Sequence, residues 1–169
     1  MTTTFRAAGR DDAVAIDRIF RTSFCDTFGD LYREEDLATF LSGFRQGAWE
    51  TELSDPRYAF QIAEVDGEPA AYVKLGPLKL PVKTSRPAIA LDQLYVLKEH
   101  HGAGIARHLM DWAIEEAKRR GAEDMYLTVY IDNHRARRLY DHYGFEDVGR
   151  YAFMVGSHAD EDVIMRRSL

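Results

Sequence analysis

Apolar residues recur along this chain of 169 residues at two spacings, one typical of strands and one typical of helices. Strand patterns cover Thr3–Ala8, Tyr58–Val65, Glu68–Leu80, Ile89–Leu97, Met125–Ile131, Glu146–Val155 and Val163–Met165. Helical patterns cover Ala13–Phe24, Glu34–Phe44, the segment between Gly102 and Gly121, and the segment between Asn133 and Gly144. This order predicts a mixed α/β protein with a strand–loop–helix–strand–helix unit in its second half.

Turn and capping residues indicate where several of these elements begin and end. Asp66-Gly67 is typical of a type I′ turn, so the strands on either side of it are expected to form a hairpin. Asp11 or Asp12 is expected to cap the first helix, and Asp132 or Asn133 the last one.

Composition then narrows the class of protein. The chain is 46% hydrophobic and 30% charged, which favours one globular domain over residues 1–169. Its formal net charge of −6 argues against a nucleic-acid partner and favours cationic small molecules. No apolar run approaches the length of about 20 residues that crosses a bilayer. The first residues lack the apolar stretch of a signal peptide. The single cysteine, Cys25, has no internal disulfide partner, as is typical of a reducing compartment. We therefore expect a cytoplasmic protein with no membrane partner.

The most informative segment is Gly102-Ala103-Gly104-Ile105-Ala106-Arg107, which joins a strand to a helix. Small residues let backbone N–H groups converge at a helix N-terminus, an arrangement that suits phosphate oxygens. A Walker loop would end in Gly-Lys-Ser/Thr, and a dinucleotide-binding loop would carry glycine at position 107; neither pattern is present. A tight turn whose small residues serve packing is the alternative interpretation.

Four features around this loop together resemble the GCN5-related N-acetyltransferase (GNAT) superfamily: Leu94-Tyr95-Val96, then His101-x-x-Gly104-x-Ala106, then Asn133 and Tyr140 within NHRARRLYDHYGF. The resemblance extends from Phe5 to the final strand. It implies an α/β fold with a central mixed, mostly antiparallel twisted sheet, flanked by helices, whose splayed central strands form a slot for CoA. The segments DTFGDLYREEDLATFL and FMVGSHADEDVIM resemble the PaiA-type branch, whose members include polyamine acetyltransferases.

This resemblance implies acetyl-CoA as the co-substrate, with no metal, and direct transfer of the acetyl group to a primary amine. The family loop reads Gln/Arg-x-x-Gly-x-Gly/Ala and holds the CoA pyrophosphate; His101 stands at the Gln/Arg position here. The backbone amide of Val96 or Leu94 is expected to face the acetyl carbonyl. The residues expected to bind the cofactor are Leu94, Tyr95, Val96, His101, Gly102, Ala103, Gly104, Ile105, Ala106, Arg107, Asn133 and Tyr140.

Two side chains are the candidates for proton transfer. Asp92 interrupts an apolar strand, where burial would raise its pKa toward the range of a useful base, and strand alternation places it on one face with Leu94 and Val96. A carboxylate that only hydrogen-bonds a neighbouring loop is the alternative, and Glu99 and Tyr95 are weaker candidates for the base. Tyr140 is the expected acid for the leaving thiolate, unless it is a plain core tyrosine.

The remaining candidates concern the acceptor. Phe24, Phe28 and Tyr32 are expected either to line the acceptor pocket or to pack in the core. Cys25 is interpreted as a core residue rather than a nucleophile, and the six histidines match no familiar metal-ligand spacing.

Resemblance and net charge both favour a polyamine acceptor. A peptide or protein N-terminus is the alternative substrate, and a non-catalytic acetyl-CoA-binding regulator is the alternative class of protein. Members of the family frequently form homodimers, and the sequence leaves the oligomeric state of this chain open.

Overall fold

Strands and helices alternate along the chain in the computed structural model, which describes residues 1–169 apart from the side chain of Gln46. The strands are β1 (Thr3–Ala7), β2 (Ala59–Val65), β3 (Glu68–Pro77), β4 (Ala88–Val96), β5 (Asp124–Tyr130), β6 (Glu146–Val155) and β7 (His158–Ser168). The helices are α1 (Ala13–Phe28), α2 (Glu34–Ser42), α3 (Gln46–Ser54), α4 (Ile105–Arg119) and α5 (His134–His142), with short 3-10 turns η1 (Arg10–Asp12), η2 (Gly29–Leu31) and η3 (Lys98–His100).

One sheet contains all seven of these strands in the order β1-β2-β3-β4-β5-β7-β6. Every neighbouring pair is antiparallel except β4 and β5, which are parallel because α4 crosses between them. The expected mixed, mostly antiparallel sheet is therefore confirmed, and its one parallel pair lies at the centre.

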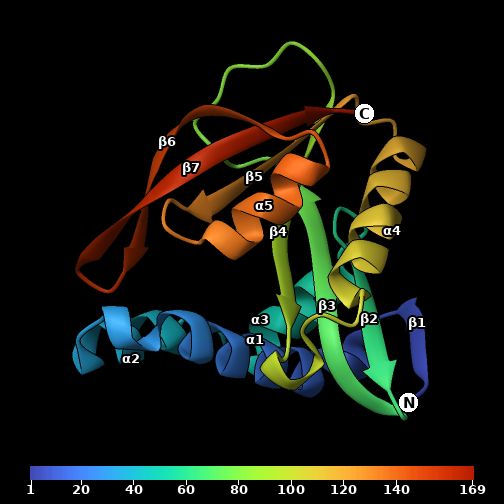
Figure 1. Cartoon of the computed structure of the whole chain (residues 1–169), viewed down its shortest axis with the longest axis vertical. Helices are drawn as coiled ribbons and strands as arrows, with labels where there is room; N and C mark the ends of the chain where they lie inside the picture. Colours follow the sequence, from blue (N-terminus) through green and yellow to red (C-terminus); the bar gives the residue numbers. More distant parts are fainter.

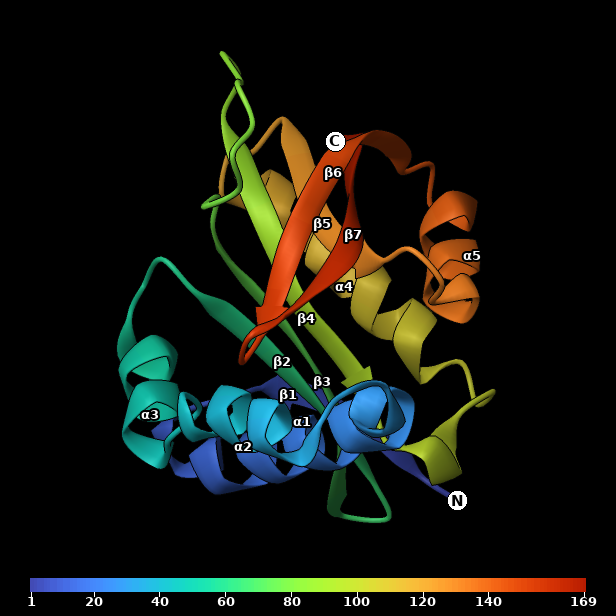
Figure 2. The same cartoon turned by 90° about the vertical axis from the view of Figure 1, so that its left-hand side faces the viewer.

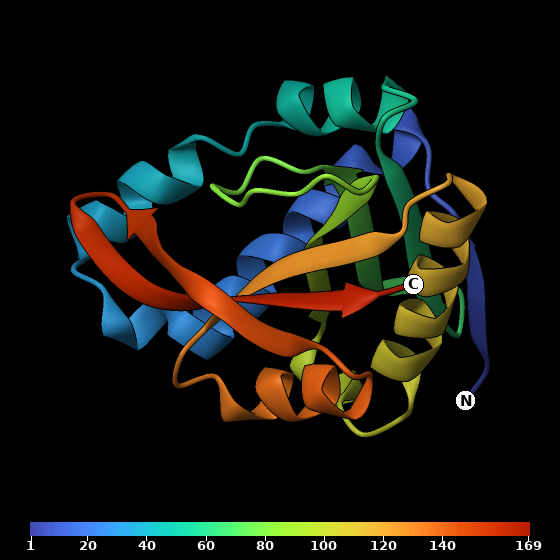
Figure 3. The same ribbon diagram turned by 90° about the horizontal axis from the view of Figure 1, so that it is seen from above.

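The sheet separates two layers of helices, as Figure 1 shows. On one face α4 and α5 pack against the strands through a core that contains Leu109, Met125 and Tyr140. On the other face α1 and α3 pack through a second core that contains Phe20 and Trp49. Seen from above, α2 and α3 lie on the opposite side of the strands from α5 (Figure 3).

The hairpin of β6 and β7 reaches across to α2 (Figure 2). The Asp36 carboxylate of α2 accepts hydrogen bonds from the backbone N–H of Ser157, at 2.8 Å, and from the Ser157 hydroxyl, at 2.7 Å. Gly156 leaves room for this contact, since a Cβ there would lie 2.5 Å from the Cα of Asp36. The hairpin is therefore fastened to a helix from the first third of the chain.

Several local predictions are confirmed. Asp66 and Gly67 have φ values of 51° and 85°, as a type I′ turn requires, and β2 and β3 form the expected hairpin. Asn133 caps α5, because its side chain accepts a hydrogen bond from the N–H of Ala136 at 3.3 Å.

One local prediction was wrong, and one helix was not predicted. Asp12 does not cap α1: its carboxylate accepts a hydrogen bond from the N–H of Gly9 and closes η1, the turn that precedes the helix. Helix α3 was missed because its few apolar side chains, Trp49 among them, make a weak pattern. Among the described residues, no helix combines the length and the apolar character that a membrane span requires.

Candidate active site

The centre of the sheet opens where β4 and β5 diverge. Within the described chain these strands pair from Ala88 with Asp124 to Ala90 with Tyr126, and then separate, while β5 continues along β7. The remainder of β4 therefore keeps one row of backbone groups free on its β5 side. The splayed central strands expected from the sequence are confirmed.

Two amides of β4 point into this opening. The N–H of Leu97 donates to the carbonyl of Ala70 on β3, at 2.9 Å. Because successive N–H groups along a strand point to opposite sides, those of Val96 and Leu94 turn away from β3 and toward β5. These are the two amides predicted to face an acetyl carbonyl, a role that stays a prediction.

The glycine loop lies at one end of this opening and leads into α4. Gly102 and Gly104 have φ values of 81° and 82°, which favour glycine, and Gly104 is the residue that precedes the first turn of α4. The first N–H groups of a helix have no carbonyl partner within it, so those of Ile105, Ala106 and Arg107 point out of the helix end. Together with the helix dipole they form a site suited to an anion.

His101 connects this loop to β4. Its Nε2 donates a hydrogen bond to the carbonyl of Val96 at 2.8 Å, an assignment that leaves Nδ1 as the acceptor for the Arg135 guanidinium of α5. Burial lowers the pKa of His101, and the neighbouring Arg135 lowers it further, so the ring is neutral near pH 7. Arg135 therefore provides a cation beside the loop, where the family pattern has Gln or Arg at position 101.

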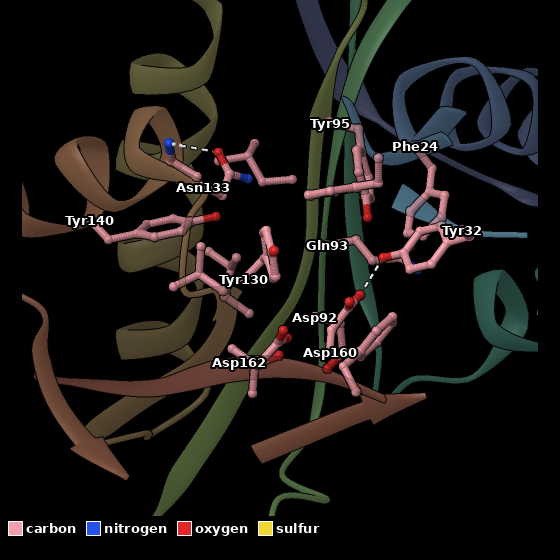
Figure 4. A pocket seen from close by; sticks show the side chains of 17 residues that line it. Phe24, Tyr32, Asp92, Gln93, Tyr95, Tyr130, Asn133, Tyr140, Asp160 and Asp162 are labelled. Carbon is pink, nitrogen blue, oxygen red and sulfur yellow. Dashed lines mark hydrogen bonds between the residues drawn. The ribbon is translucent and has the colours of Figure 1, made fainter. Parts of the chain in front are cut away.

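A pocket continues from the opening toward α1 and the β6–β7 hairpin. Figure 4 shows Tyr140 and Asn133 on one side of this pocket, Phe24 and Tyr32 on the opposite side, and Asp160 and Asp162 between them. It is lined by Phe24, Phe28, Tyr32, Leu91, Asp92, Gln93, Leu94, Tyr95, Thr128, Val129, Tyr130, Asn133, Ala136, Tyr140, Phe153, Asp160 and Asp162. The two phenylalanines and the tyrosine proposed from the sequence for an acceptor pocket do line this one.

Tyr140 points into the pocket from α5, beside the divergence of the strands (Figure 4). Its side chain is 7% exposed and packs edge-on against Phe145, while burial raises its pKa to about 12. A phenol with this pKa is protonated at every physiological pH and is able to donate a proton. Tyr140 thus belongs both to the core and to the pocket wall.

Asp92 lies at a β-bulge, which gives it other neighbours than the sequence predicted. The register between β3 and β4 passes from Lys74–Gln93 to Leu75–Leu91, so Asp92 has no partner on β3. Leu94 and Val96 pack on the α4 side of the sheet, whereas the Asp92 carboxylate lies on the α3 side. The prediction that these three residues share one face was wrong, because the extra residue reverses the alternation.

The surroundings of Asp92 suit a group that exchanges a proton. Burial raises its pKa to about 6, and Glu52 raises it further, against the attraction of Lys74, whose Nζ lies 3.7 Å from the carboxylate. Lys74 is itself buried and pairs with Glu52 of α3 at 2.8 Å. Asp92 therefore has a raised pKa even though it forms a weak ion pair with Lys74.

Asp160 and Asp162 line the pocket from β7, and sequence analysis did not identify them. Each is only 6% exposed, whereas the side chain of Glu161 between them is 62% exposed. Asp160 accepts a hydrogen bond from the Tyr32 hydroxyl. The strand period offers a signal for the pair, since two acids at alternate positions lie on one face of β7, but the predicted strand, Val163–Met165, began after them.

The weaker candidates lie elsewhere. Cys25 is exposed on α1, so its interpretation as a core residue was wrong: it lies one position beyond Phe24, past the buried face of the helix. Glu99 is exposed on η3, after β4 has ended. Tyr95 lines the pocket, and burial raises the pKa of its hydroxyl.

Comparison with known proteins identifies the family. The sequence model of the acetyltransferase (GNAT) family matches residues 16–145. An uncharacterised N-acetyltransferase of Mycobacterium bovis is 33% identical over 136 residues, which cover 80% of this chain and 83% of that protein. Another, from Lactobacillus delbrueckii, is 26% identical over 153 residues, or 89% of this chain and 88% of the relative.

Solved structures share the fold at lower identity. The PaiA N-acetyltransferase of Thermoplasma acidophilum, in complex with coenzyme A, superimposes with a TM-score of 0.80 at 19% identity, over 100% of both chains. The ribosomal-protein-S18-alanine N-acetyltransferase of Escherichia coli gives 0.73 at 18% identity, over 99% of this chain and 94% of that one. The family match covers most of the chain, which confirms the resemblance seen in its sequence. The chain therefore belongs to the acetyltransferase (GNAT) family, and it is an N-acetyltransferase that uses acetyl-CoA.

Proposed function

We propose that this enzyme passes the acetyl group of acetyl-CoA directly to a primary amine in a ternary complex, and that the amine is a polyamine. One observation carries the proposal: a single pocket joins the opening beside β4, where Leu94 and Tyr140 lie, to the buried acids of β7. Donor and acceptor are thus able to meet in one space, without a covalent enzyme intermediate.

The donor end follows from the loop and the open strand. The amides at the start of α4 receive the pyrophosphate of CoA, since they combine free N–H donors with the positive end of the helix dipole. Asn133, Leu94 and Val96 border the path from this loop into the pocket, along which the pantetheine arm extends with backbone hydrogen bonds to β4.

The reaction then needs one nucleophilic attack and two proton transfers. The neutral amine nitrogen attacks the thioester carbonyl carbon, and the oxyanion that forms is stabilised by the N–H of Val96 or Leu94, a contribution of about 3 kcal/mol for a preorganised donor. The C–S bond breaks, and Tyr140 protonates the departing thiolate. Asp92 accepts the amine proton, directly or through a water molecule, because its pKa of about 6 leaves it mostly ionised at neutral pH.

Charge favours a polyamine as acceptor. The acetyl-accepting side of the pocket contains Asp92, Asp160 and Asp162, and the whole chain carries a net charge of −6. The resemblance of two sequence segments to the PaiA-type branch, whose members include polyamine acetyltransferases, supports the same acceptor. A peptide N-terminus is the second candidate, supported by the similar fold of the Escherichia coli enzyme named for a ribosomal-protein alanine.

Thiol release from acetyl-CoA tests the proposal across a panel of polyamines, aminoglycosides and peptides. Spermidine or a related polyamine is expected to give the highest kcat/KM. Turnover with peptides and with no polyamine would contradict the acceptor assignment and would favour the second candidate.

Tyr140→Phe separates an enzyme from a regulator that only binds acetyl-CoA. It is expected to lower kcat by about a hundredfold or more while the Kd for CoA stays within about twofold. Tyr126→Phe is the matched control, a buried tyrosine of β5 that is expected to leave kcat unchanged. Unchanged turnover in Tyr140→Phe would remove this residue from the mechanism.

A further inference from the structure

The two acids of β7 differ in how far their charges are compensated. Asp160 accepts a hydrogen bond from the Tyr32 hydroxyl and lies 3.1 Å from Nε2 of His158. Asp162 has a hydrogen-bonding neighbour in Thr128 of β5, but among the described residues no Lys, Arg or His forms an ion pair with it. Other buried acids of this chain do have cations, as Asp124 has Arg86 at 3.2 Å.

Burial without a cation is costly for a carboxylate, and a second carboxylate beside it increases the cost. Burial, together with the neighbouring Asp160, raises the pKa of Asp162 to about 7. Both side chains point into the pocket rather than into a packed core (Figure 4). A cationic ligand in the pocket would supply the positive charge that no side chain of the protein supplies to Asp162.

The pair lines the same pocket as Asp92 but lies on β7, whereas Asp92 lies on β4. Asp92 lies 3.7 Å from Lys74 Nζ, whereas Asp160 contacts Tyr32 and His158, so the acids of the two strands have different partners. Alternate residues of a strand lie about 6.7 Å apart, which gives an extended ammonium chain two successive anionic partners.

The rest of this end of the pocket suits an alkylammonium chain. Phe24, Phe28, Tyr130 and Phe153 line it, and aromatic faces attract both methylene groups and ammonium groups. Tyr32 presents its hydroxyl to Asp160 and thereby orients that carboxylate.

On this basis, and resting on the proposed function, we propose that Asp160 and Asp162 form a subsite for a second, non-reacting ammonium group, so that the enzyme selects diamines and longer polyamines over monoamines. Asp162 binds the ammonium without competition from a protein cation, and Asp160 extends the subsite toward Tyr32. Neither residue takes part in the proton transfers assigned to Asp92 and Tyr140.

The test compares putrescine with butylamine, which share one carbon chain and differ by the second amine. The wild type is expected to favour putrescine in kcat/KM by at least about tenfold. Asp162→Asn is expected to reduce that preference by about ten- to a hundredfold, the usual effect of losing a buried charged hydrogen bond, while the KM for acetyl-CoA stays constant. Asp160→Asn, as a second variant, is expected to act in the same direction.

Glu161→Gln is the matched control, because it removes the same charge from the same strand on the exposed face. It is expected to change the preference by less than about twofold. Retention of the putrescine preference in both Asn variants would overturn the subsite and leave the proposed function intact.

Failure of the proposed function shows in the wild type alone, as absence of thiol release with every amine of the panel. In that case calorimetric binding of spermidine to the CoA complex still decides the subsite. Binding that is at least about tenfold weaker in Asp162→Asn than in Glu161→Gln supports it, and equal binding refutes it.

Discussion

Replacing Asp162 by Asn tests whether this carboxylate is held in the pocket at the expense of stability. The folded protein raises its pKa from 3.8 to about 7, chiefly through burial and also through Asp160. Taken at full value, this difference corresponds to about 4 kcal/mol of unfolding free energy. Relaxation of the folded protein and penetration of water reduce this penalty, so we expect about 1–2 kcal/mol.

The sign follows from proton binding. Between pH 4 and pH 7 the folded state holds a proton on Asp162 that the unfolded state has released, so wild-type stability falls as pH rises through this range. The Asn side chain does not titrate, so position 162 of the variant contributes no loss of stability between pH 4 and pH 7. The stability advantage of Asp162→Asn is therefore expected to be small near pH 4, to grow up to about pH 7, and to stay level above pH 8.

Thermal unfolding of the wild type, Asp162→Asn and Glu161→Gln at several pH values measures this difference. For a chain of 169 residues, 1–2 kcal/mol corresponds to a rise in Tm of about 2–8 °C at pH 8. The Glu161→Gln control is expected to follow the wild type at every pH. A lower Tm for Asp162→Asn at pH 8, or an advantage that does not change with pH, would refute the reasoning.

Three further substitutions test the donor site and the base. Asp92→Asn is expected to lower kcat. It is also expected to abolish the decline of kcat below about pH 6 in the wild type, because a base with this raised pKa must be ionised to act. A pH–rate profile at saturating amine measures both effects. Gly104→Ala is expected to raise the KM for acetyl-CoA about fivefold or more, because alanine at a φ of 82° costs about 1 kcal/mol. His101→Gln is expected to leave that KM unchanged or lower, as steady-state kinetics will show.

Each of these has an outcome that contradicts it. A pH profile of Asp92→Asn that keeps its acidic limb would assign the limb to another group. Gly9→Ala is the control for Gly104→Ala, because Gly9 has a φ of −124° and open space around it. It is expected to leave the KM for acetyl-CoA unchanged. Equal effects of the two substitutions would contradict the role of the glycine loop in binding acetyl-CoA. A loss of more than about tenfold in His101→Gln would show that the imidazole contacts the donor.

The elements of the proposed donor side were largely predictable from the sequence, whereas only Phe24, Phe28 and Tyr32 of the proposed acceptor side were. The glycine loop, Asn133 and Tyr140 lie within one continuous segment, where local turn and helix patterns fix the backbone. The proposed acceptor pocket brings Tyr32, which follows η2, against β7, more than a hundred residues later, so the Tyr32–Asp160 contact has no local signal. Asp160 and Asp162 do alternate on one strand, but their pattern alone does not reveal which element they face.

Asp92 illustrates a different limit. The apolar run from Ile89 to Leu97 predicted its strand, but a single extra residue at the bulge moved Asp92 to the face opposite Leu94 and Val96. Strand alternation holds only while the register is regular, and bulges leave weak marks in a sequence. The raised pKa expected from burial was nevertheless found, because Asp92 lines the pocket, although its side chain is 28% exposed.

The hydrogen bonds between Asp36 and Ser157 hold the β6–β7 hairpin on α2, without any contact to the glycine loop. In the proposed mechanism acetyl-CoA contacts residues between Leu94 and Tyr140, whereas the proposed acceptor pocket also takes residues from α1 and from the β6–β7 hairpin. Residues on the hairpin are therefore free to be exchanged without disturbing the glycine loop. Such a division makes the hairpin the natural place to engineer a new acceptor preference while the donor is kept.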